Sequence, residues 1–488
     1  IMICAPSNGA IDEIGLRLIS EMNTFFSEKD KLSLKKDKLS PEKDTSSSKT
    51  GASSSEKDTS SSETGASSSE KDTSSSEKHT SSSNDRKLRI IRIGQKHDIH
   101  KGMLPYEIET LTNDNFIKFQ MDYLNWIENC KDKDEEKKFK NGKKRTKLRD
   151  QLIYEADIIL TTLASSQHSS LSMFRSDTPG YTYSQKAIRC LIVDEASQCS
   201  EPEFFMPFIY HSITKVIMVG DPLQLPATVI SRLAYNAGYG RSLFERFYQY
   251  QLQQSNSNEF LSSSSSSIIR LTQQYRMHEE ICKFPSKLFY DSSLQTINDI
   301  GKNSHIPFHP YFVFSIKDSK ESSSNQSKSN DAEVIFIRKL LTEILKKIGY
   351  VDNFHQPSPV SIGIITYYRE QKKAIKDGLE KEFPEDLVKQ IQIDTVDSFQ
   401  GRECDIIILS CVRAIATNNP KGSIGFVRDQ QRMNVALTRA RSSLFICLHF
   451  ESFENVHRWK QLIEDANKRK RLFFVSSKIF NNKLEVCL

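Results

Sequence analysis

The sequence predicts an α/β protein of two lobes, each built on a parallel sheet. A series of short apolar runs, each ending in polar residues and followed by a helical pattern, is the first observation. Such runs are typical of parallel strands that are buried on both faces. The second observation is a serine-rich stretch at 254–267, after which the alternation of strand and helix begins again. With 488 residues, the chain is long enough for two or three domains.

The apolar run 191–193 is followed directly by Asp194 and Glu195. Acids at the end of a buried strand lie at the carboxyl edge of a parallel sheet, where open α/β folds bind ligands. In nucleotide-hydrolysing sites of this kind, the strand-end Asp holds Mg²⁺ and a neighbouring carboxylate orients or deprotonates the attacking water. We predict these roles for Asp194 and Glu195, although the pair by itself also fits a helix cap.

Two further strands of the first lobe end in polar residues. Residues 1–5 form a predicted strand that Pro6 stops, and Ser7 or Asn8 caps the helix that follows. This arrangement can present backbone amides to a phosphate, and an ordinary strand-to-helix turn explains it equally well. The predicted strand over 154–162 ends in paired hydroxyls.

The next strand, over 215–219, leads into a loop that carries a neutral amide. Gly220 allows the chain to turn sharply at the strand end, and Asp221 and Gln224 project from the loop. An amide close to a terminal phosphate can hydrogen-bond it and report its loss.

Several polar segments interrupt this pattern. Residues 27–87 contain a repeated Glu-Lys-Asp-Thr unit padded with serine, and they cannot bury enough apolar surface to fold. We predict a disordered repeat there, a linker at 254–267, a disordered loop at 318–330 and a tail at 476–488. Residues 88–150 begin with a strand at 88–93 and otherwise predict an inserted, mostly helical subdomain. The first lobe then comprises 1–26 and 151–253, and the second comprises 268–475.

The second lobe again alternates strand and helix. The predicted helices lie at 332–348 and 370–379, and the predicted strands at 360–365, 406–412 and 443–449. In the segment 429–441, apolar residues recur at helical spacing up to Ala440, and Arg432 and Arg439 border this stripe. Arginines at the edge of a buried stripe suit an interface that faces an anion.

Composition narrows the setting of the protein. The net charge of +6 permits a nucleic-acid partner without requiring one. The nine cysteines are scattered without a Cys-x-x-Cys pair, which argues against a zinc site or disulfide framework and favours a reducing compartment. No apolar run approaches the roughly 18 to 20 residues that a membrane helix needs. We therefore expect a nuclear or cytoplasmic protein without a membrane partner.

The motifs occur in a recognisable order: APSN, ADIILTTL, LIVDEASQCSEPE, VGDPLQLPATV, QYRMHEEICKFPSKLF, IGIITYYREQ, TVDSFQGRECDIIILSCVRA and GFVRDQQRMNVALTRAR. This series resembles superfamily 1 RNA/DNA helicases of the branch that contains senataxin and the nonsense-mediated-decay helicase. The resemblance implies two RecA-like lobes that clamp ATP and Mg²⁺, with a single strand lying across both. It further implies a monomeric, ATP-dependent 5′→3′ helicase acting on single-stranded RNA or DNA and on RNA/DNA hybrids.

The resemblance also implies roles for individual residues. Those matching the family's catalytic positions are Asp194 for Mg²⁺, Glu195 as base, Gln224 as γ-phosphate sensor, and Arg276 and Arg439 as arginine fingers. Those matching its nucleotide contacts are Tyr275, Gly401 and Glu403. Those matching its nucleic-acid contacts are Pro6, Ser7, Asn8, Thr161, Thr162, Thr366 and Val396.

Two departures from the family pattern qualify this prediction. The chain has Thr366-Tyr367 where the family has Thr-Pro, and it contains no Gly-x-x-x-x-Gly-Lys-Ser/Thr phosphate loop. The family places that loop ahead of APSN, so we expect a fragment whose first lobe is incomplete at its N-terminus. We also expect that a strand beside the Asp194 strand is missing, and that the isolated chain folds poorly in its first lobe and does not hydrolyse ATP. The alternatives are a catalytically dead, helicase-like nucleic-acid-binding protein and a scaffold acting through the serine repeats.

Overall fold

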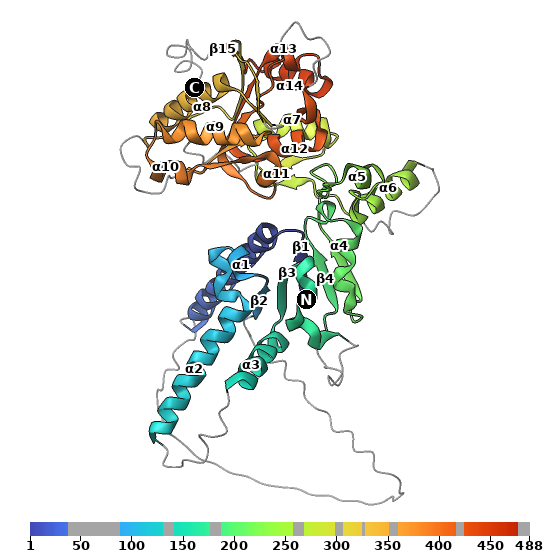
Figure 1. Cartoon of the computed structure of the whole chain (residues 1–488), viewed down its shortest axis with the longest axis vertical. Helices are drawn as coiled ribbons and strands as arrows, with labels where there is room; N and C mark the ends of the chain where they lie inside the picture. Colours follow the sequence, from blue (N-terminus) through green and yellow to red (C-terminus); the bar gives the residue numbers. More distant parts are fainter. Residues whose placement is uncertain are drawn as a thin grey trace, which may run out of the picture.

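The computed structural model describes residues 1–37, 88–129, 141–175, 187–256, 268–297, 306–324, 327–350, 360–415 and 424–476. These residues form two lobes, one above the other in Figure 1, and each lobe contains an all-parallel sheet. The predicted two-lobed α/β fold is therefore confirmed. None of the described helices has the length and apolar character needed to cross a membrane.

The first lobe has a five-stranded parallel sheet in the order β2-β3-β1-β4-β5. Its strands are β1 (Met2–Ala5), β2 (Ile90–Ile93), β3 (Ile158–Thr162), β4 (Cys190–Val193) and β5 (Lys215–Met218). Side chains of β1 alternate between two cores, since Met2 and Cys4 pack on one face and Ile3 and Ala5 on the other. Both faces are covered, which explains why the strand sequences are apolar without alternation.

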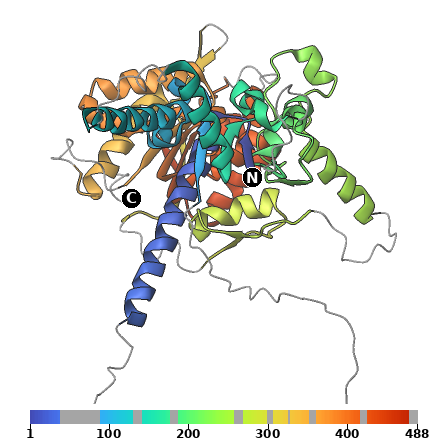
Figure 2. The same ribbon diagram turned by 90° about the horizontal axis from the view of Figure 1, so that it is seen from below.

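The helices of the first lobe are α1 (Asn8–Asp37), α2 (Ile108–Asn129), α3 (Asn141–Glu155), α4 (Glu201–Phe205), α5 (Arg232–Asn236) and α6 (Leu243–Asn256). Helices α2 and α3 lie side by side and point away from the second lobe in Figure 1. Figure 2 shows the far end of α1 extending beyond the body of the lobe. The N-terminal part of α1 packs on β1 and β3.

Two predicted boundaries in the first lobe are wrong. Helix α1 continues to Asp37, into the range 27–87 predicted to be disordered, because residues 28–37 are rich in the helix formers Glu, Lys and Leu and lack Gly and Pro. Strand β2 pairs with β3, so residues 90–93 belong to the sheet of the lobe and not to an inserted subdomain. The remainder of the predicted repeat, 38–87, lies outside the described residues, as do 257–267 of the linker and 477–488 of the tail.

The strand that carries Asp194 is not at an edge of the sheet. Strand β4 hydrogen-bonds β1 on one side and β5 on the other, so the expectation of a missing neighbour beside it is wrong. The sheet instead ends at β5, where Val216, Ile217 and the following Val219 are partly exposed. Sequence reasoning identified the strands, but their order depends on contacts between distant segments.

The second lobe has a six-stranded parallel sheet in the order β12-β11-β13-β14-β8-β15. Its strands are β8 (Tyr311–Ile316), β11 (Ile362–Thr366), β12 (Gln392–Thr395), β13 (Cys404–Ser410), β14 (Ala440–Leu448) and β15 (Leu472–Val475). Two apolar cores cover its faces. The strands β8, β12 and β15 were not predicted as separate elements, whereas β11, β13 and β14 were.

The helices of the second lobe are α7 (Glu279–Phe289), α8 (Asp331–Lys347), α9 (Arg369–Glu380), α10 (Glu385–Gln390), α11 (Val396–Phe399), α12 (Gln430–Leu437), α13 (Phe450–Phe453) and α14 (His457–Lys468). A short parallel pair is formed by β6 (Gln273–Gln274) and β7 (Gln295–Thr296). Helix α12 ends at Leu437, so Arg439 lies in the turn before β14 and not on the predicted helical stripe.

The predicted disordered loop at 318–330 instead contains an antiparallel hairpin. Its strands are β9 (Ser322–Ser324) and β10 (Ser327–Ser329). Glu321, next to this hairpin, accepts a hydrogen bond from Arg413 Nε at 2.6 Å and pairs with Lys328 at 2.8 Å. These charged contacts between distant segments order a sequence whose composition alone favours disorder.

A fully buried carboxylate lies beneath the end of β13. The Glu333 carboxylate, on α8, accepts hydrogen bonds from Ser410 Oγ at 2.5 Å and from the Val412 amide at 3.0 Å. Burial raises the pKa of Glu333 from 4.5 to about 8, although these two donors oppose the change. The folded protein therefore retains a proton there that the unfolded chain has already released.

We predict that this proton makes stability depend on pH. Because the folded-state pKa is raised, the stabilisation is present below pH 4.5 and is lost as the pH rises through about 8. The free energy of unfolding of Glu333→Gln, measured in urea across about pH 5 to 9, should lose this downward slope. Glu343→Gln changes a partly exposed glutamate of the same helix and should keep it. An unchanged slope in Glu333→Gln would contradict the prediction.

Candidate nucleotide site between the lobes

The two predicted catalytic acids lie in a tight turn immediately after β4. Glu195 adopts a left-handed conformation with φ 51° and ψ 38°, which is uncommon for a residue other than glycine. Its Oε2 accepts a hydrogen bond from Gln198 Nε2 at 2.6 Å. The turn is fixed from both sides, because the Ala196 amide donates to Val219 O and the Val219 amide donates to Val193 O, each at 2.8 Å.

Burial dominates the electrostatics of these acids. It raises the pKa of Asp194, and a nearby Arg17 partly opposes that change. Burial also raises the pKa of Glu195. The hydrogen bond from Gln198 and the attraction of Arg439 oppose this change, and repulsion from Asp194 and Asp221 adds to it. A carboxylate whose pKa is raised accepts a proton more readily, which suits the predicted base.

The loop after β5 holds Gln224 in a defined place. Gln224 Nε2 donates to Asp221 Oδ2 at 2.8 Å, and Asp221 Oδ1 accepts from the Leu223 amide at 2.9 Å. Tyr290, in the second lobe, donates its hydroxyl to the same Asp221 Oδ2 at 2.6 Å. Through Asp221, the side chain that the resemblance assigns to phosphate sensing is therefore connected to the opposite lobe.

A second set of contacts crosses the same boundary from α12. Asn434 Nδ2 donates to Leu223 O at 3.0 Å and to Tyr290 Oη at 2.7 Å, and Gln431 Nε2 donates to Pro222 O at 3.1 Å. Sequence reasoning missed Tyr290 and Asn434. Asn434 belongs to the last of the motifs, but no spacing rule shows that Tyr290 and Asn434 reach a loop that lies 69 and 211 residues away in the chain.

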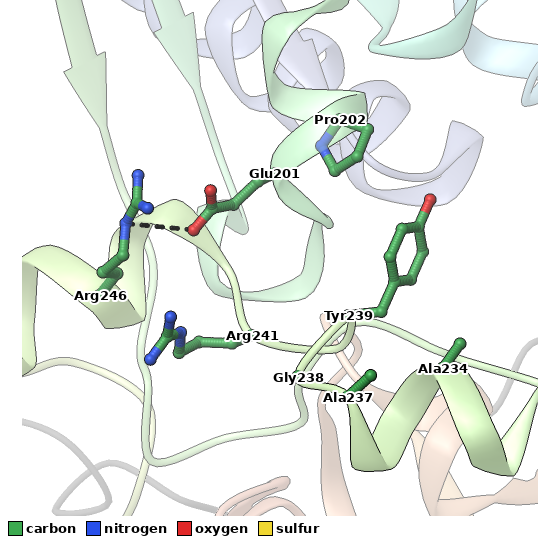
Figure 3. Close-up of a pocket in the computed structure, with 8 residues that line it drawn as sticks. All are labelled: Glu201, Pro202, Ala234, Ala237, Gly238, Tyr239, Arg241 and Arg246. Atoms are coloured by element: carbon green, nitrogen blue, oxygen red, sulfur yellow. Dashed lines mark ion pairs between the residues drawn. The ribbon is translucent and has the colours of Figure 1, made fainter.

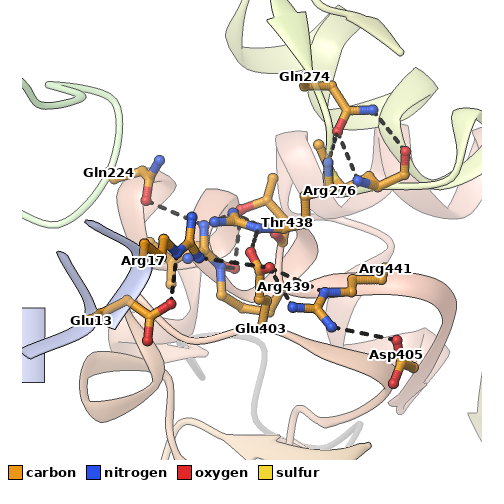
Figure 4. A network of polar contacts seen from close by, with 12 residues as sticks. Glu13, Arg17, Gln224, Gln274, Arg276, Glu403, Asp405, Thr438, Arg439 and Arg441 are labelled. Atoms are coloured by element: carbon orange, nitrogen blue, oxygen red, sulfur yellow. Dashed lines mark hydrogen bonds and ion pairs between the residues drawn. The ribbon is translucent and has the colours of Figure 1, made fainter. Parts of the chain in front are cut away.

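Arg439 of the second lobe reaches the same loop. Its side chain is 1% exposed, and its Nη2 donates to Gln224 Oε1 at 3.3 Å across the boundary between the lobes (Figure 4). Its other acceptors are Thr438 Oγ1 at 2.8 Å and Val435 O at 3.1 Å. Burial, reinforced by Arg276, lowers the pKa of Arg439 to about 9. The oxygens that accept these three hydrogen bonds are neutral, and Glu195 and Glu403 offset the charge in part.

Arg276, the other predicted finger, is already paired. Glu403 accepts from Arg276 Nε and, at 2.7 Å, from Arg441 Nη2, and Arg17 of the first lobe approaches it at 3.9 Å (Figure 4). Burial alone would raise the pKa of Glu403, but Arg276 and Arg441 together lower it to about 2. The structure therefore places Glu403 as an anion between arginines.

The other predicted nucleotide contacts lie close to this cluster in sequence. Gly401, two residues before Glu403, has a φ of +78°, which favours glycine because other side chains rarely adopt it. Tyr275, next to Arg276, is 70% exposed. Its ring is therefore accessible for stacking.

A Mg²⁺ ion that binds together with a nucleotide is usually held by one or two carboxylates of the protein and by the phosphates. Asp194 supplies such a carboxylate at the strand end. Within the described ranges, no three His, Cys, Asp or Glu residues gather as a metal-binding group. The carboxylate of Asp194 is of the kind that can contact a Mg²⁺ ion bound together with a phosphate.

The predicted nucleic-acid contacts of the first lobe lie together at the carboxyl ends of β1 and β3. Cys4 and Ala5 are in register with Thr161 and Thr162, so Pro6, which follows Ala5, lies beside the end of β3. Ser7 is exposed, and Pro6 and Asn8 are half-buried. Thr161 and Thr162 are both buried, and the Thr162 hydroxyl accepts from the Ser165 amide at 3.1 Å.

In the second lobe, Thr366 ends β11 and Val396 begins α11. Thr366 is in register with Ser410 of β13 and Thr395 of β12, which places it at the carboxyl edge of that sheet. Both predicted contact residues are buried, with exposures of 0% and 1%. These exposures include the backbone, so in this arrangement neither residue offers a strand an exposed surface.

A pocket of about 500 Å³ lies elsewhere on the first lobe (Figure 3). Glu201, Tyr239, Arg241 and Arg246 are among the residues that line it, and Arg246 pairs with Glu201 at 3.2 Å. None of the residues predicted for the nucleotide site lines this pocket.

Comparisons with known proteins agree with the motifs. Two family profiles, each described as an AAA domain, match residues 1–232 and 239–450. The chain is 35% identical to the probable helicase senataxin of Homo sapiens over 96% of its length, covering 16% of that protein. It is 41% identical to the senataxin of Mus musculus over 65% of its length, covering 11%. It is 36% identical to the helicase SEN1 of Saccharomyces cerevisiae over 66% of its length, covering 13%.

Among solved structures, the chain resembles the PRRSV helicase with 13% identity and a TM-score of 0.29, over 62% of this chain and 40% of that one. The curated relatives are much longer than this chain, which spans about a sixth of human senataxin. On the ordered motifs, the two profiles and these identities, the chain belongs to the senataxin-type helicases of superfamily 1.

Proposed function

We propose that this protein is a helicase that hydrolyses ATP between its two lobes and moves 5′→3′ along single-stranded RNA or DNA. RNA/DNA hybrids are then its substrates for unwinding. The observation that carries the proposal is the buried Arg439 of the second lobe, which reaches Gln224 of the first lobe. Asp194 and Glu195 follow the strand next to the one that leads to Gln224. The polarity rests on family membership alone.

The residues divide the work of phosphoryl transfer between the lobes. Asp194 would hold Mg²⁺, which neutralises charge on the phosphates when it is bound. Glu195 would accept a proton from the attacking water, and its raised pKa supports that role. Arg439 would face the γ-phosphate from the second lobe, and Gln224 would hydrogen-bond it from the first.

This division connects hydrolysis to movement. When the cation and the acids belong to different lobes, the site is complete only while the lobes are together. Loss of the γ-phosphate removes the anion that Arg439 faces and so weakens the closed state. With a strand bound at the carboxyl edges of both sheets, alternate closing and opening would advance the protein along it.

The test of the proposal is unwinding by the full-length protein. We expect ATP-dependent separation of duplexes that carry a 5′ single-stranded overhang, and little separation of the same duplex with a 3′ overhang. Glu195→Gln is the control, since it keeps the shape of the side chain and removes the base. Equal unwinding of both duplexes would refute the polarity, and ATP-independent strand binding alone would favour a non-catalytic protein.

We predict that Arg439→Lys abolishes most ATP turnover. A lysine cannot donate at once to Gln224 and to Val435 as the guanidinium does. Loss of an arginine finger lowers the rate by about 10³ to 10⁵. Steady-state ATPase assays of the full-length protein should show this fall in kcat with little change in affinity for a single strand. Arg338→Lys is the matched control, because it alters an arginine of α8 that is paired with Glu382. A kcat equal to that of the parent would contradict the role.

We further predict that Tyr290→Phe slows ATP turnover by about tenfold without loss of fold. The change removes the hydroxyl that joins Asp221 to Asn434, and each hydrogen bond lost to a charged group has an effect of that order. The measurements are kcat for ATP and the thermal midpoint of unfolding. Tyr311→Phe is the control, because the buried Tyr311 hydroxyl has no hydrogen-bond partner among the described residues. If both variants behave alike, the contact between lobes has no catalytic role.

A further inference from the structure

Arg92 is an arginine buried inside the first lobe. It lies on β2 between two buried isoleucines, and its exposure is 0%. A guanidinium in such a place is tolerated only when an opposite charge and hydrogen-bond acceptors surround it. Nothing in the motifs assigns it a role, because it lies in the segment predicted to be an inserted subdomain.

The acceptors come from the beginning of α1. Arg92 Nε donates to Asp12 Oδ1 and Arg92 Nη2 donates to Asn8 Oδ1, each at 2.7 Å. Asn8 and Asp12 are four residues apart, so they share one face of the helix. Arg92 Nη1 donates to Ile93 O at 2.5 Å. At Gly94, an added Cβ would lie 2.9 Å from Nη1, so the glycine leaves room for the guanidinium.

The chemistry of arginine fixes the orientation of the Asn8 amide. A guanidinium donates hydrogen bonds and accepts none, so Asn8 must turn its carbonyl oxygen toward Arg92. The Asn8 NH₂ group then points away from Arg92. Asn8 is half-buried and follows Pro6 and Ser7 at the end of β1, the edge where a strand is proposed to bind.

We propose that Arg92 is a positioning residue that makes Asn8 present a hydrogen-bond donor to a phosphate oxygen of a bound single strand. Asp12 neutralises the Arg92 charge, so Arg92 acts through Asn8 and not as a cation seen by the strand. The inference rests on the proposed function, because it requires a strand at this edge. A phosphate oxygen accepts hydrogen bonds only, and it therefore matches the NH₂ group and not the carbonyl.

The experiment measures equilibrium binding of fluorescein-labelled oligouridine to the chain of 488 residues, without nucleotide. Arg92→Lys keeps a charge for Asp12 but lacks the fork that also reaches Asn8. We expect it to weaken binding by about tenfold in the parent and to have no further effect beside Asn8→Ala. Arg89→Lys is the matched control, since Arg89 lies next to β2 and pairs with Glu155 away from Asn8. Equal binding by Arg92→Lys and parent, or additive effects with Asn8→Ala, would overturn the inference.

Asn8→Asp tests the same idea without disturbing Arg92. The carboxylate still accepts from Arg92 but offers no donor to the strand, so binding should weaken while the thermal midpoint does not fall. Repulsion by the new charge is screened at high salt, whereas a missing donor is not, so the defect should persist at about 0.5 M salt. A defect that disappears at high salt would contradict the inference. If the parent chain itself does not bind oligouridine, the proposed strand binding fails, and this inference fails with it.

Discussion

A buried positive charge at the boundary between the lobes is the constraint on which the proposed site depends. Arg439 is 1% exposed, and the oxygens that accept its hydrogen bonds are those of Val435, Thr438 and Gln224, all of them neutral. Neutral acceptors satisfy the N–H groups, and Glu195 and Glu403 offset the charge only in part, so burial together with the nearby Arg276 lowers the pKa of Arg439 to about 9. An anion placed beside Gln224 would relieve this cost. The site is thus most favourable when a phosphate is bound, which is what a nucleotide-dependent closure requires.

Arg276 is in the opposite electrostatic position. Its charge is compensated by Glu403, whose pKa lies near 2 because Arg276 and Arg441 stabilise the carboxylate. Bringing Arg276 to a phosphate would mean exchanging one anion for another, whereas Arg439 would gain an anion where neutral oxygens now lie. The two arginines that look equivalent in sequence therefore differ in how strongly a nucleotide would change their energy. This difference is visible only when their partners from distant segments are known.

Sequence patterns predicted the strands that end in the proposed site, because buried parallel strands are continuous apolar runs and their ends are marked by polar residues. They failed where long-range contacts decide the structure. The strand order around β4, the hairpin beside Glu321 and the end of α12 before Arg439 all depend on partners far away in the chain. Tyr290 and Asn434 were missed for the same reason, since each is defined by its contact with the loop after β5. The motifs identified candidate residues, and the fold determines which of them meet.

In each sheet, one strand is followed by a residue with a left-handed backbone, close to the proposed binding edge. Glu195 follows β4 with a φ of 51°, and Val412 follows β13 with a φ of 70°. The second is the more costly, because a β-branched side chain rarely adopts this conformation. It is held by Glu333, which accepts from the Val412 amide, and by Asn330, which donates to Val412 O at 2.8 Å. Both polar groups of the strained Val412 peptide backbone are therefore satisfied inside the lobe, which explains how a costly turn is kept at the end of β13.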